Sequence, residues 1–261
     1  MPEIIAVVNQ KGGVGKTTTA INIGACLAAA GKKTLLIDAD SQGNSTSGLG
    51  IVKKTLSKCI YHTLIDDEPL KNITLETPMP GLFIAPANLD LLGINQELND
   101  IENGQLRLKE VLDSQLIDDD GRKIYDFVII DAPPNLDMML INIMAASTKI
   151  LIPTLPEWLA LEGLADLVDT YSRIRETLNK KISILGILIT KYVSTNKLSR
   201  EVANELRENM PGLVFDNVIP QNVRLAEAPG YCKPIIMYDP RSTGAVSYQA
   251  VTDEILARVG K

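Results

Sequence analysis

The sequence is poor in the residues that most often carry out acid–base chemistry or form cross-links. Its 261 residues include one histidine, His62, and three scattered cysteines, Cys26, Cys59 and Cys232. A single histidine argues against histidine-based catalysis. The cysteines are odd in number and form no C-x-x-C pair, so we expect neither a disulfide framework nor a zinc site.

Long apolar runs and aromatic clusters are also missing. No apolar stretch approaches the roughly 20 residues that cross a bilayer, and the N-terminus lacks the features of a signal peptide. We therefore expect a cytosolic protein. Aromatic residues make up only 4% of the chain, including the single Trp158, which predicts no stacking platform for single-stranded nucleic acid.

Acidic residues outnumber basic ones, but unevenly along the chain. The formal net charge is −6. Residues 1–170 contain 13 Lys and Arg against 23 Asp and Glu, whereas residues 171–261 contain 13 against 9. The C-terminal third therefore carries an excess of positive charge, which is typical either of a solvated face or of a surface for an anionic partner.

Apolar runs rich in Val and Ile recur along the chain, with helix-compatible segments between them. They are residues 4–8, 34–37, 82–85, 127–130, 150–153, 184–190 and 214–219. Continuous rather than alternating apolar strands predict a mostly parallel sheet covered by helices on both faces. The expected fold is doubly wound α/β. No Pro-, Gly- or Ser-rich linker divides the chain, so we expect a single domain over residues 1–261.

A glycine-rich segment lies between the first apolar run and a helix-compatible stretch, residues 19–30. It reads Lys11-Gly12-Gly13-Val14-Gly15-Lys16-Thr17-Thr18. This pattern is typical of a phosphate-binding loop, whose backbone N–H groups and following helix surround the phosphates of a nucleotide. Lys16 is expected to reach the β- and γ-phosphates, and Thr17 to place its hydroxyl on Mg²⁺. Lys11 has no role in the ordinary scheme.

Carboxylates stand at the ends of two predicted strands. Asp38 and Asp40 follow the second apolar run, and Asp131 follows the fourth. In parallel sheets ligands bind where the strands end, and a carboxylate there needs a cation or a donor to offset its desolvation. We expect Asp131 to act on Mg²⁺ mainly through bound water. Asp40 should lie near the metal and orient the attacking water, whereas Asp38 is the candidate for holding the loop by local hydrogen bonds.

With these residues in place, the loop resembles the deviant Walker A motif of the ParA/MinD class of P-loop ATPases. Further segments resemble ParA/Soj partition ATPases in the same order. They are residues 38–50, 131–134, 157–163, 219–229 and 233–242. The resemblance covers nearly the whole chain, although Ser41 stands where the family usually has proline. It implies weak ATPase activity with ATP and Mg²⁺, and a sandwich homodimer in which Lys11 reaches the partner's nucleotide.

The resemblance also implies macromolecular partners. ATP-bound dimers of Soj-like proteins bind double-stranded DNA without sequence preference, and a ParB-type centromere-binding protein stimulates their hydrolysis. The implied location is the cytoplasm, with association to the nucleoid in the ATP-bound state. The cargo stays open between a chromosome, a plasmid and an integrated mobile element.

Particular residues take up the family's roles in this sequence. Those at or near DNA-contacting positions are Arg224, Lys233, Lys197 and Arg200, and those at the adenine pocket are Pro220 and Asn222. A plain turn is the alternative reading of the last pair. Thr195 and Gln221 stand where relatives carry arginine, so we predict weaker or more salt-sensitive DNA binding, unless Lys191, Lys197 or Arg200 compensates.

Three other readings share part of the pattern. A membrane-associated positioning ATPase similar to MinD is the main alternative, but residues 252–261 contain two acids and too little apolar face for a lipid-binding helix. An electron-transfer protein similar to the nitrogenase iron protein would need bridging cysteines, and none follows Asp131 closely. A longer plasmid autorepressor would need an N-terminal helix-turn-helix domain, for which we expect no space before Asn9.

Overall fold

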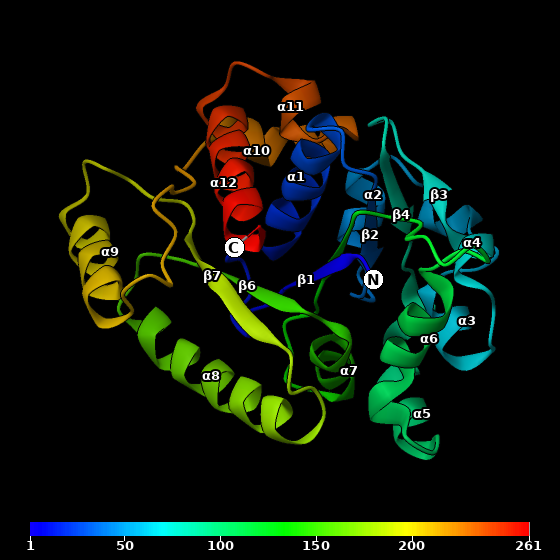
Figure 1. Cartoon of the computed structure of the whole chain (residues 1–261). Helices are drawn as coiled ribbons and strands as arrows, with labels where there is room; N and C mark the ends of the chain where they lie inside the picture. Colours follow the sequence, from blue (N-terminus) through cyan, green and yellow to red (C-terminus); the bar gives the residue numbers. More distant parts are fainter. Residues whose placement is uncertain (261) are drawn as a thin grey trace.

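The structure is a computed structural model that describes residues 1–260, apart from the side chains of residues 159–162. A seven-stranded sheet with the order β3-β4-β2-β5-β1-β6-β7 forms its centre (Figure 1). The strands are β1 (Glu3–Val7), β2 (Thr34–Asp38), β3 (Leu75–Glu76), β4 (Leu82–Ala85), β5 (Phe127–Asp131), β6 (Lys149–Thr154) and β7 (Ser183–Ile189). Neighbouring strands are parallel except for the short β3, which pairs antiparallel with β4.

Helices cover both faces of the sheet. The α-helices are α1 (Lys16–Ala29), α2 (Asn44–Gly48), α3 (Ile60–Ile65), α4 (Leu70–Ile73), α5 (Ile94–Asp100), α6 (Arg107–Gln115), α7 (Met138–Ala146), α8 (Leu159–Thr177), α9 (Lys197–Asn209), α10 (Val223–Glu227), α11 (Ile235–Tyr238) and α12 (Thr243–Val259). The 3-10 helices are η1 (Lys53–Thr55), η2 (Leu89–Gly93), η3 (Gly104–Leu106) and η4 (Ala228–Tyr231). Among the described residues, none of these helices combines the length and the apolar character needed to cross a bilayer.

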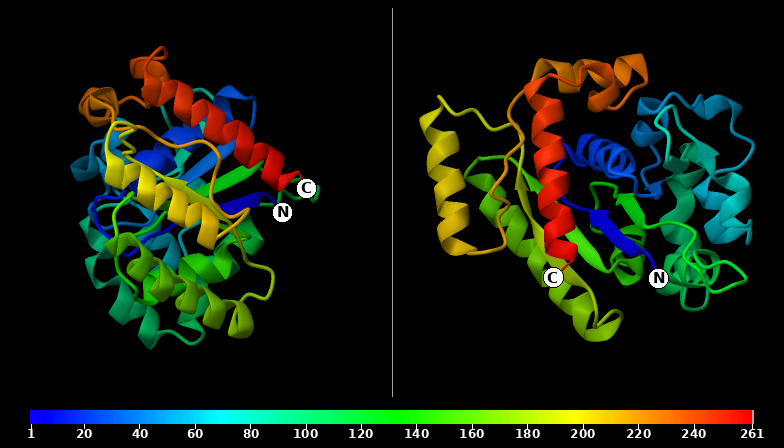
Figure 2. Two further views of the ribbon diagram at one scale, coloured as in Figure 1. Left: turned by 90° about the vertical axis from the view of Figure 1, so that its left-hand side faces the viewer. Right: turned by 45° about the horizontal axis from the view of Figure 1, so that its top comes forward.

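The hydrophobic core has two parts, one on each face of the sheet. One face packs against α1, α11 and α12, and the other packs against α3 and α5 to α9 (Figure 1). On the first face α1 and α12 lie side by side (Figure 2), with the hydroxyl oxygens of Thr19 and Tyr248 3.1 Å apart. The predicted doubly wound α/β fold is confirmed.

Six of the seven predicted strands coincide with β1, β2, β4, β5, β6 and β7, but the prediction for residues 214–219 is wrong. This segment follows the edge strand β7 and pairs with it only at isolated points, such as the 2.9 Å bond from Phe215 N to Ile187 O. Between these points, the backbone amides of Asp216 and Asn217 donate to the carboxylate of Glu254 on α12, at 3.0 and 3.2 Å. A continuous strand is lost because a distant side chain takes these donors.

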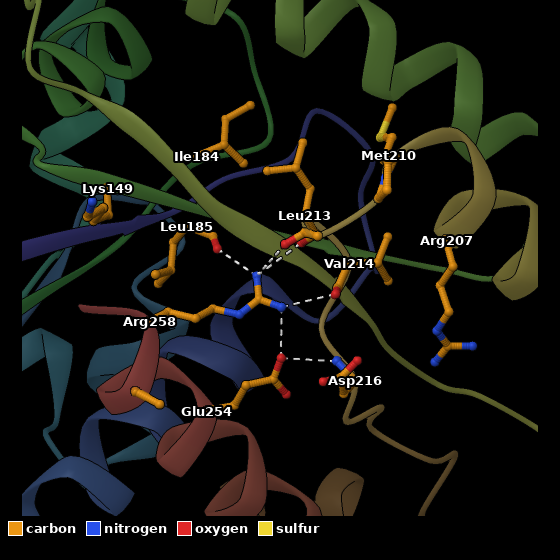
Figure 3. A pocket seen from close by; sticks show the side chains of 13 residues that line it. Lys149, Ile184, Leu185, Arg207, Met210, Leu213, Val214, Asp216, Glu254 and Arg258 are labelled. Atoms are coloured by element: carbon orange, nitrogen blue, oxygen red, sulfur yellow. Dashed lines mark hydrogen bonds and ion pairs between the residues drawn. The ribbon is translucent and has the colours of Figure 1, made fainter. Parts of the chain in front are cut away.

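Arg258, near the end of α12, ties this helix to the same edge of the sheet. Its guanidinium donates to the carbonyl oxygen of Leu185 at 2.9 Å, to that of Val214 at 3.0 Å and to Glu254 at 2.8 Å (Figure 3). It also stacks 4.1 Å from the ring centroid of Phe215. Arg258, Glu254, Leu185 and Val214 line a cavity of about 790 Å³ at the amino ends of β6 and β7. Both terminal nitrogens of the guanidinium are bonded to groups of the protein itself. We therefore assign Arg258 a structural role, tying α12 to the sheet, rather than a role in ligand binding.

Gly186 leaves the space that this tie occupies. A Cβ at Gly186 would lie 2.5 Å from the Phe215 ring and 2.7 Å from both the Arg258 guanidinium and the Leu213 carbonyl oxygen. We expect Gly186→Ala to lower the melting temperature by roughly 2–6 °C, because overpacking costs about 1–3 kcal/mol. Thermal unfolding followed by circular dichroism measures this. Gly163→Ala on α8 is the matched control, since no described atom lies within 4 Å of its Cβ. Equal melting temperatures for the two variants would contradict the role of Gly186.

Candidate active site

The predicted phosphate-binding loop joins β1 to α1 at the carboxyl end of the sheet. Gly13 and Gly15 have φ angles of +75° and +89°, which residues with a Cβ atom rarely adopt. A Cβ at Gly12 or Gly13 would meet no described atom within 4 Å. The loop backbone is therefore open to the approach of a ligand in front of the helix N-terminus, where anions bind favourably.

Lys16 is the first residue of α1, and its side chain lies inside the loop. The residue is only 8% exposed, and its ammonium donates to the carbonyl oxygen of Lys11 at 3.3 Å. Burial lowers the pKa of Lys16, while the carboxylates of Asp131 and Asp40 act in the opposite direction. A partly desolvated cation in this position is placed to pair with a phosphate.

Contacts from distant segments hold the loop, and no motif in the sequence predicted them. The hydroxyl of Thr190 donates to the carbonyl oxygen of Val14 at 2.8 Å. The ammonium of Lys191, a residue with φ of +50°, donates to the carbonyl oxygen of Gly13 at 2.8 Å. Both residues follow β7, so their roles depend on the sheet order. The side chain of Asn9 accepts the backbone N–H of Lys11 at 2.9 Å.

Two carboxylates are buried next to each other beside the loop. Asp38 and Asp131 are register partners on β2 and β5, 0% and 1% exposed. Burial raises the pKa of Asp131 to about 7; Asp38 adds to the shift, and the hydroxyls of Ser45 and Thr17 oppose it. Ser45 donates to Asp131 Oδ2 at 2.8 Å, but Oδ1 is buried and has no hydrogen-bond partner among the described residues.

Asp131 Oδ1, the orphan oxygen without a partner among the described residues, is the position at which a divalent cation would fit. A buried carboxylate oxygen without a donor is costly, and a hydrated Mg²⁺ would satisfy it. The Thr17 hydroxyl lies near the Asp131 carboxylate and counters the rise in its pKa. The structure thus brings together Thr17 and Asp131, two of the three residues that the sequence predicts at the metal.

Asp38 is fully engaged in holding the segment that follows β2. Its Oδ2 accepts the backbone N–H and the hydroxyl of Thr46 at 2.8 and 2.7 Å. The Thr46 hydroxyl in turn accepts the N–H of Ala87 at 2.9 Å. Burial raises the pKa of Asp38 to about 6, and the bonds from Thr46 counter that rise. This geometry agrees with the local, loop-holding role considered for Asp38.

Asp40 is less buried and stands on the turn after β2. Its Oδ1 accepts the backbone N–H of Gln42 at 2.9 Å, and its carbonyl oxygen accepts that of Gly43 at 2.8 Å. The carboxylate is near enough to Lys16 to raise the pKa of that ammonium. Asp40 is therefore held at the mouth of the phosphate loop, where it can meet solvent.

Lys11 points away from the loop toward Glu157. Its ammonium lies 2.6 Å from Glu157 Oε2, and the two side chains are 37% and 51% exposed. Exposed ion pairs contribute about 1 kcal/mol or less. The contact within this chain therefore leaves Lys11 available to another carboxylate or phosphate, and sequence reasoning did not identify Glu157 as its neighbour.

A cavity of about 430 Å³ continues from the phosphate loop. Its lining includes Gly15, Thr18, Lys191, Pro220 and Asn222. Asn222 is the N-cap residue of α10, and its side-chain amide donates to the hydroxyl of Thr243 at 2.6 Å. Pro220 and Asn222 therefore line the same cavity as residues of the phosphate loop.

The four predicted DNA-contacting residues do not form one patch of free cations. Arg224 pairs with Glu227 at 2.8 Å and approaches Asp239 at 3.6 Å. Arg200 donates to a backbone carbonyl oxygen at 2.7 Å. Lys197 lies 3.5 Å from a glutamate one turn along α9. Lys233 is exposed and lines a different cavity, of about 360 Å³, together with Thr17 and Thr18.

The segments that carry these residues are nevertheless joined. The backbone N–H of Gln221 donates to the carbonyl oxygen of Tyr192 at 3.0 Å, which links the start of α10 to the loop before α9. Thr195 and Gln221 are both exposed on these segments. The two positions where the family resemblance implies arginine therefore face solvent in this chain without a charge.

The chain is similar in sequence to bacterial partition proteins. It is 43% identical over 257 residues to the sporulation initiation inhibitor protein Soj of Bacillus subtilis, which covers 98% of this chain and 99% of that protein. It is 41% identical over 255 residues to the chromosome partitioning protein ParA of Caulobacter vibrioides, covering 98% and 94%. A family model described as an AAA domain matches residues 2–184.

The fold is similar to solved nucleotide complexes. Cobyrinic acid a,c-diamide synthase from Mycobacterium smegmatis with bound ADP and magnesium gives a TM-score of 0.85 at 30% identity, covering 100% of this chain and 96% of that one. The septum site-determining protein MinD of Pyrococcus horikoshii complexed with Mg-ADP gives 0.78 at 22% identity, covering 100% and 99%. The second likeness shows the fold alone.

The raised pKa values make the nucleotide-free site a source of instability. Folded-state values above the ordinary 3.8 mean that the fold binds protons that the unfolded chain releases, so stability falls as pH rises toward about 7. We expect Asp131→Asn to raise the melting temperature at pH 8 by on the order of 5 °C, and by less than half of that at pH 5. Scanning calorimetry in EDTA without nucleotide measures this. Asp169→Asn, exposed on α8, is the control. A melting temperature below that of the wild type for Asp131→Asn at pH 8 would contradict the destabilising effect assigned to the ionised Asp131 carboxylate.

Proposed function

The chain belongs to the Soj/ParA family of chromosome-partitioning ATPases, and we propose that it segregates DNA through an ATP-gated cycle. In this cycle, ATP binding drives a sandwich homodimer, and the dimer binds double-stranded DNA without sequence preference. A ParB-type centromere-binding protein then stimulates hydrolysis, which returns the dimer to monomers. The observation that carries the proposal is an open phosphate loop that lies beside the orphan oxygen of Asp131. Lys11 projects from this loop toward Glu157.

The proposed ligands are ATP and Mg²⁺. The backbone amides of the open loop and the Lys16 ammonium would bind the phosphates, while the cavity beside Pro220 and Asn222 would take the base. Thr17 and Asp131 would hold the metal, with Asp40 nearby. Bound Mg²⁺ neutralises charge that develops on the phosphate oxygens. The solved synthase with ADP and magnesium, at 30% identity, supports this assignment.

Hydrolysis needs a positioned water and compensating positive charge. Asp40, held on its turn at the mouth of the loop, would orient the water that attacks the γ-phosphate. Lys11 of a second copy would supply the cation, as an arginine finger does in other P-loop enzymes. For this the Lys11–Glu157 contact must open, and an exposed pair costs little to break.

DNA binding would come from Lys and Arg contacts to phosphates, which need no base readout. In the single chain, carboxylates partly neutralise Arg224 and Lys197. A dimer doubles the number of contacts, so a weak monomer becomes an ATP-gated binder. The cycle would place the ATP-bound dimer on the nucleoid and the released monomer in the cytoplasm.

The MinD-like alternative has less support. In this chain α12 buries its apolar side chains Tyr248, Val251 and Ile255 in the core against α1 and the sheet. That packing occupies the apolar side of the last helix, which a lipid-binding helix would need to present to a membrane.

The DNA step is tested with Asp40→Ala, which should bind ATP and dimerise but hydrolyse slowly. We expect it to bind random-sequence duplex DNA with ATP and not with ADP. The logarithm of its binding constant should fall linearly with the logarithm of the salt concentration. Fluorescence anisotropy across a salt series measures both. Adding Arg200→Gln should reduce the salt slope by about one, whereas Arg122→Gln, in the turn before β5, should not. Absence of ATP-dependent binding at low salt would overturn the DNA-carried cycle.

The trans role of Lys11 is tested by size-exclusion chromatography with light scattering. Lys11→Ala should bind ATP in the presence of Mg²⁺ but remain a monomer, because the loop and Lys16 are intact while the partner loses its cation. Lys32→Ala, which removes an exposed lysine just beyond the far end of α1, should still dimerise. A stable ATP-dependent dimer of Lys11→Ala would remove Lys11 from the interface.

A further inference from the structure

Three side chains with metal-binding chemistry meet outside the ATPase site. Cys59 precedes α3, His62 lies in its first turn, and Asp90 is on η2 after β4. Cys59 Sγ lies 3.7 Å from His62 Nδ1 and 4.0 Å from Asp90 Oδ2. The ligand atoms of the three residues all lie within 4.8 Å of one another.

These separations fit a tetrahedral metal ion. With bonds of about 2.3 Å to sulfur and about 2.0 Å to nitrogen or oxygen, a tetrahedral zinc ion holds its sulfur and nitrogen ligands about 3.5 Å apart. We propose that Cys59, His62 and Asp90 form a zinc site, although the absence of a C-x-x-C pair led us to expect none from the sequence. Asn88 Oδ1, which lies 3.1 Å from Cys59 Sγ, or a water completes the coordination.

The donor set and its burial select the kind of ion. A thiolate, an imidazole and a carboxylate suit a borderline-soft divalent cation such as Zn²⁺, whereas Mg²⁺ and Ca²⁺ prefer oxygen ligands alone. Cys59 is buried, His62 is half-buried and Asp90 is exposed. The carboxylate therefore stands at the entrance of the cluster and gives an ion a path to the thiol.

A helix cap explains part of this geometry, but not all of it. Cys59 and His62 form a capping box at the start of α3, in which the Cys59 N–H donates to His62 Nδ1 at 3.1 Å. Ser or Thr followed by Glu or Gln makes that box better than Cys and His do. The box also has no need of Asp90. The cap and the metal site therefore make different demands on the same residues.

Metal binding would require a balanced exchange of protons and hydrogen bonds. Burial raises the pKa of the Cys59 thiol, so the ion must displace the thiol proton, which leaves to solvent. His62 Nδ1 would give up the hydrogen bond that it accepts from the Cys59 N–H and would bind the ion with the same lone pair. No oxidant or reductant takes part. Binding should therefore release one proton per ion and tighten as the pH rises.

The site would join α3 to the segment after β4. In that segment, Ala87 donates to Thr46, the residue that binds Asp38. A bound ion would therefore stabilise the support of the acidic residues without touching the nucleotide.

Titration calorimetry of the reduced, nucleotide-free full chain with ZnCl₂ tests the proposal. We expect one ion per chain, with a dissociation constant below about 1 μM. Cys59→Ser keeps a helix-capping side chain but removes the thiolate, and should weaken binding at least about 100-fold with no loss of metal-free stability. His62→Gln, which keeps the reciprocal cap, should also weaken it. Cys232→Ser, which removes the exposed cysteine, is the matched control and should bind as the parent does.

Cobalt(II) gives an independent readout. Wild type and Cys232→Ser should show a thiolate-to-cobalt charge-transfer band in the near ultraviolet, and Cys59→Ser should not. Absence of zinc uptake by the wild type, or equal uptake by Cys59→Ser, would overturn the site. Neither result bears on the ATPase cycle, because the titration contains no nucleotide.

Discussion

Asp38 and Asp131 are buried side by side at the carboxyl end of the sheet, and the rest of the site depends on how their negative charge is balanced. Asp38 is satisfied by Thr46, whereas Asp131 keeps one oxygen without a donor among the described residues. Lys16 is buried nearby and carries the opposite charge. The free protein therefore holds an incomplete set of charges, which a divalent cation together with polyphosphate completes. Ligand affinity is obtained at the expense of stability in the unliganded state.

The sequence predicted the parts of the site that lie next to a strand end. Lys16, Asp40 and Asp131 could be placed because parallel strands deliver their carboxyl ends to one edge of the sheet. Thr190 and Lys191 could not, because their contacts with the phosphate loop depend on β7 lying at the far side of β6. The error at residues 214–219 has the same origin, since an apolar run carries no information about Glu254.

Charge counted along the chain did not predict charge on a surface. The excess of positive charge after residue 170 includes Arg258, which is committed to carbonyl oxygens, and Arg224, which is paired with Glu227. Conversely, the exposed Thr195 and Gln221 are neutral where the family resemblance led us to look for arginine. Whether a cation can meet an anionic partner is decided by its neighbours in the fold, which the composition does not contain.

The tie formed by Arg258 also determines how the sheet ends. β7 is an edge strand, and an edge with free N–H and C=O groups is a template on which another chain can add a strand. Here the carbonyl oxygen of Leu185 is taken by the guanidinium. The irregular segment that follows α9 takes the N–H and the carbonyl oxygen of Ile187 and the carbonyl oxygen of Ile189. One arginine and an interrupted strand thus protect this edge from intermolecular β-pairing and aggregation, although neither is a strand itself.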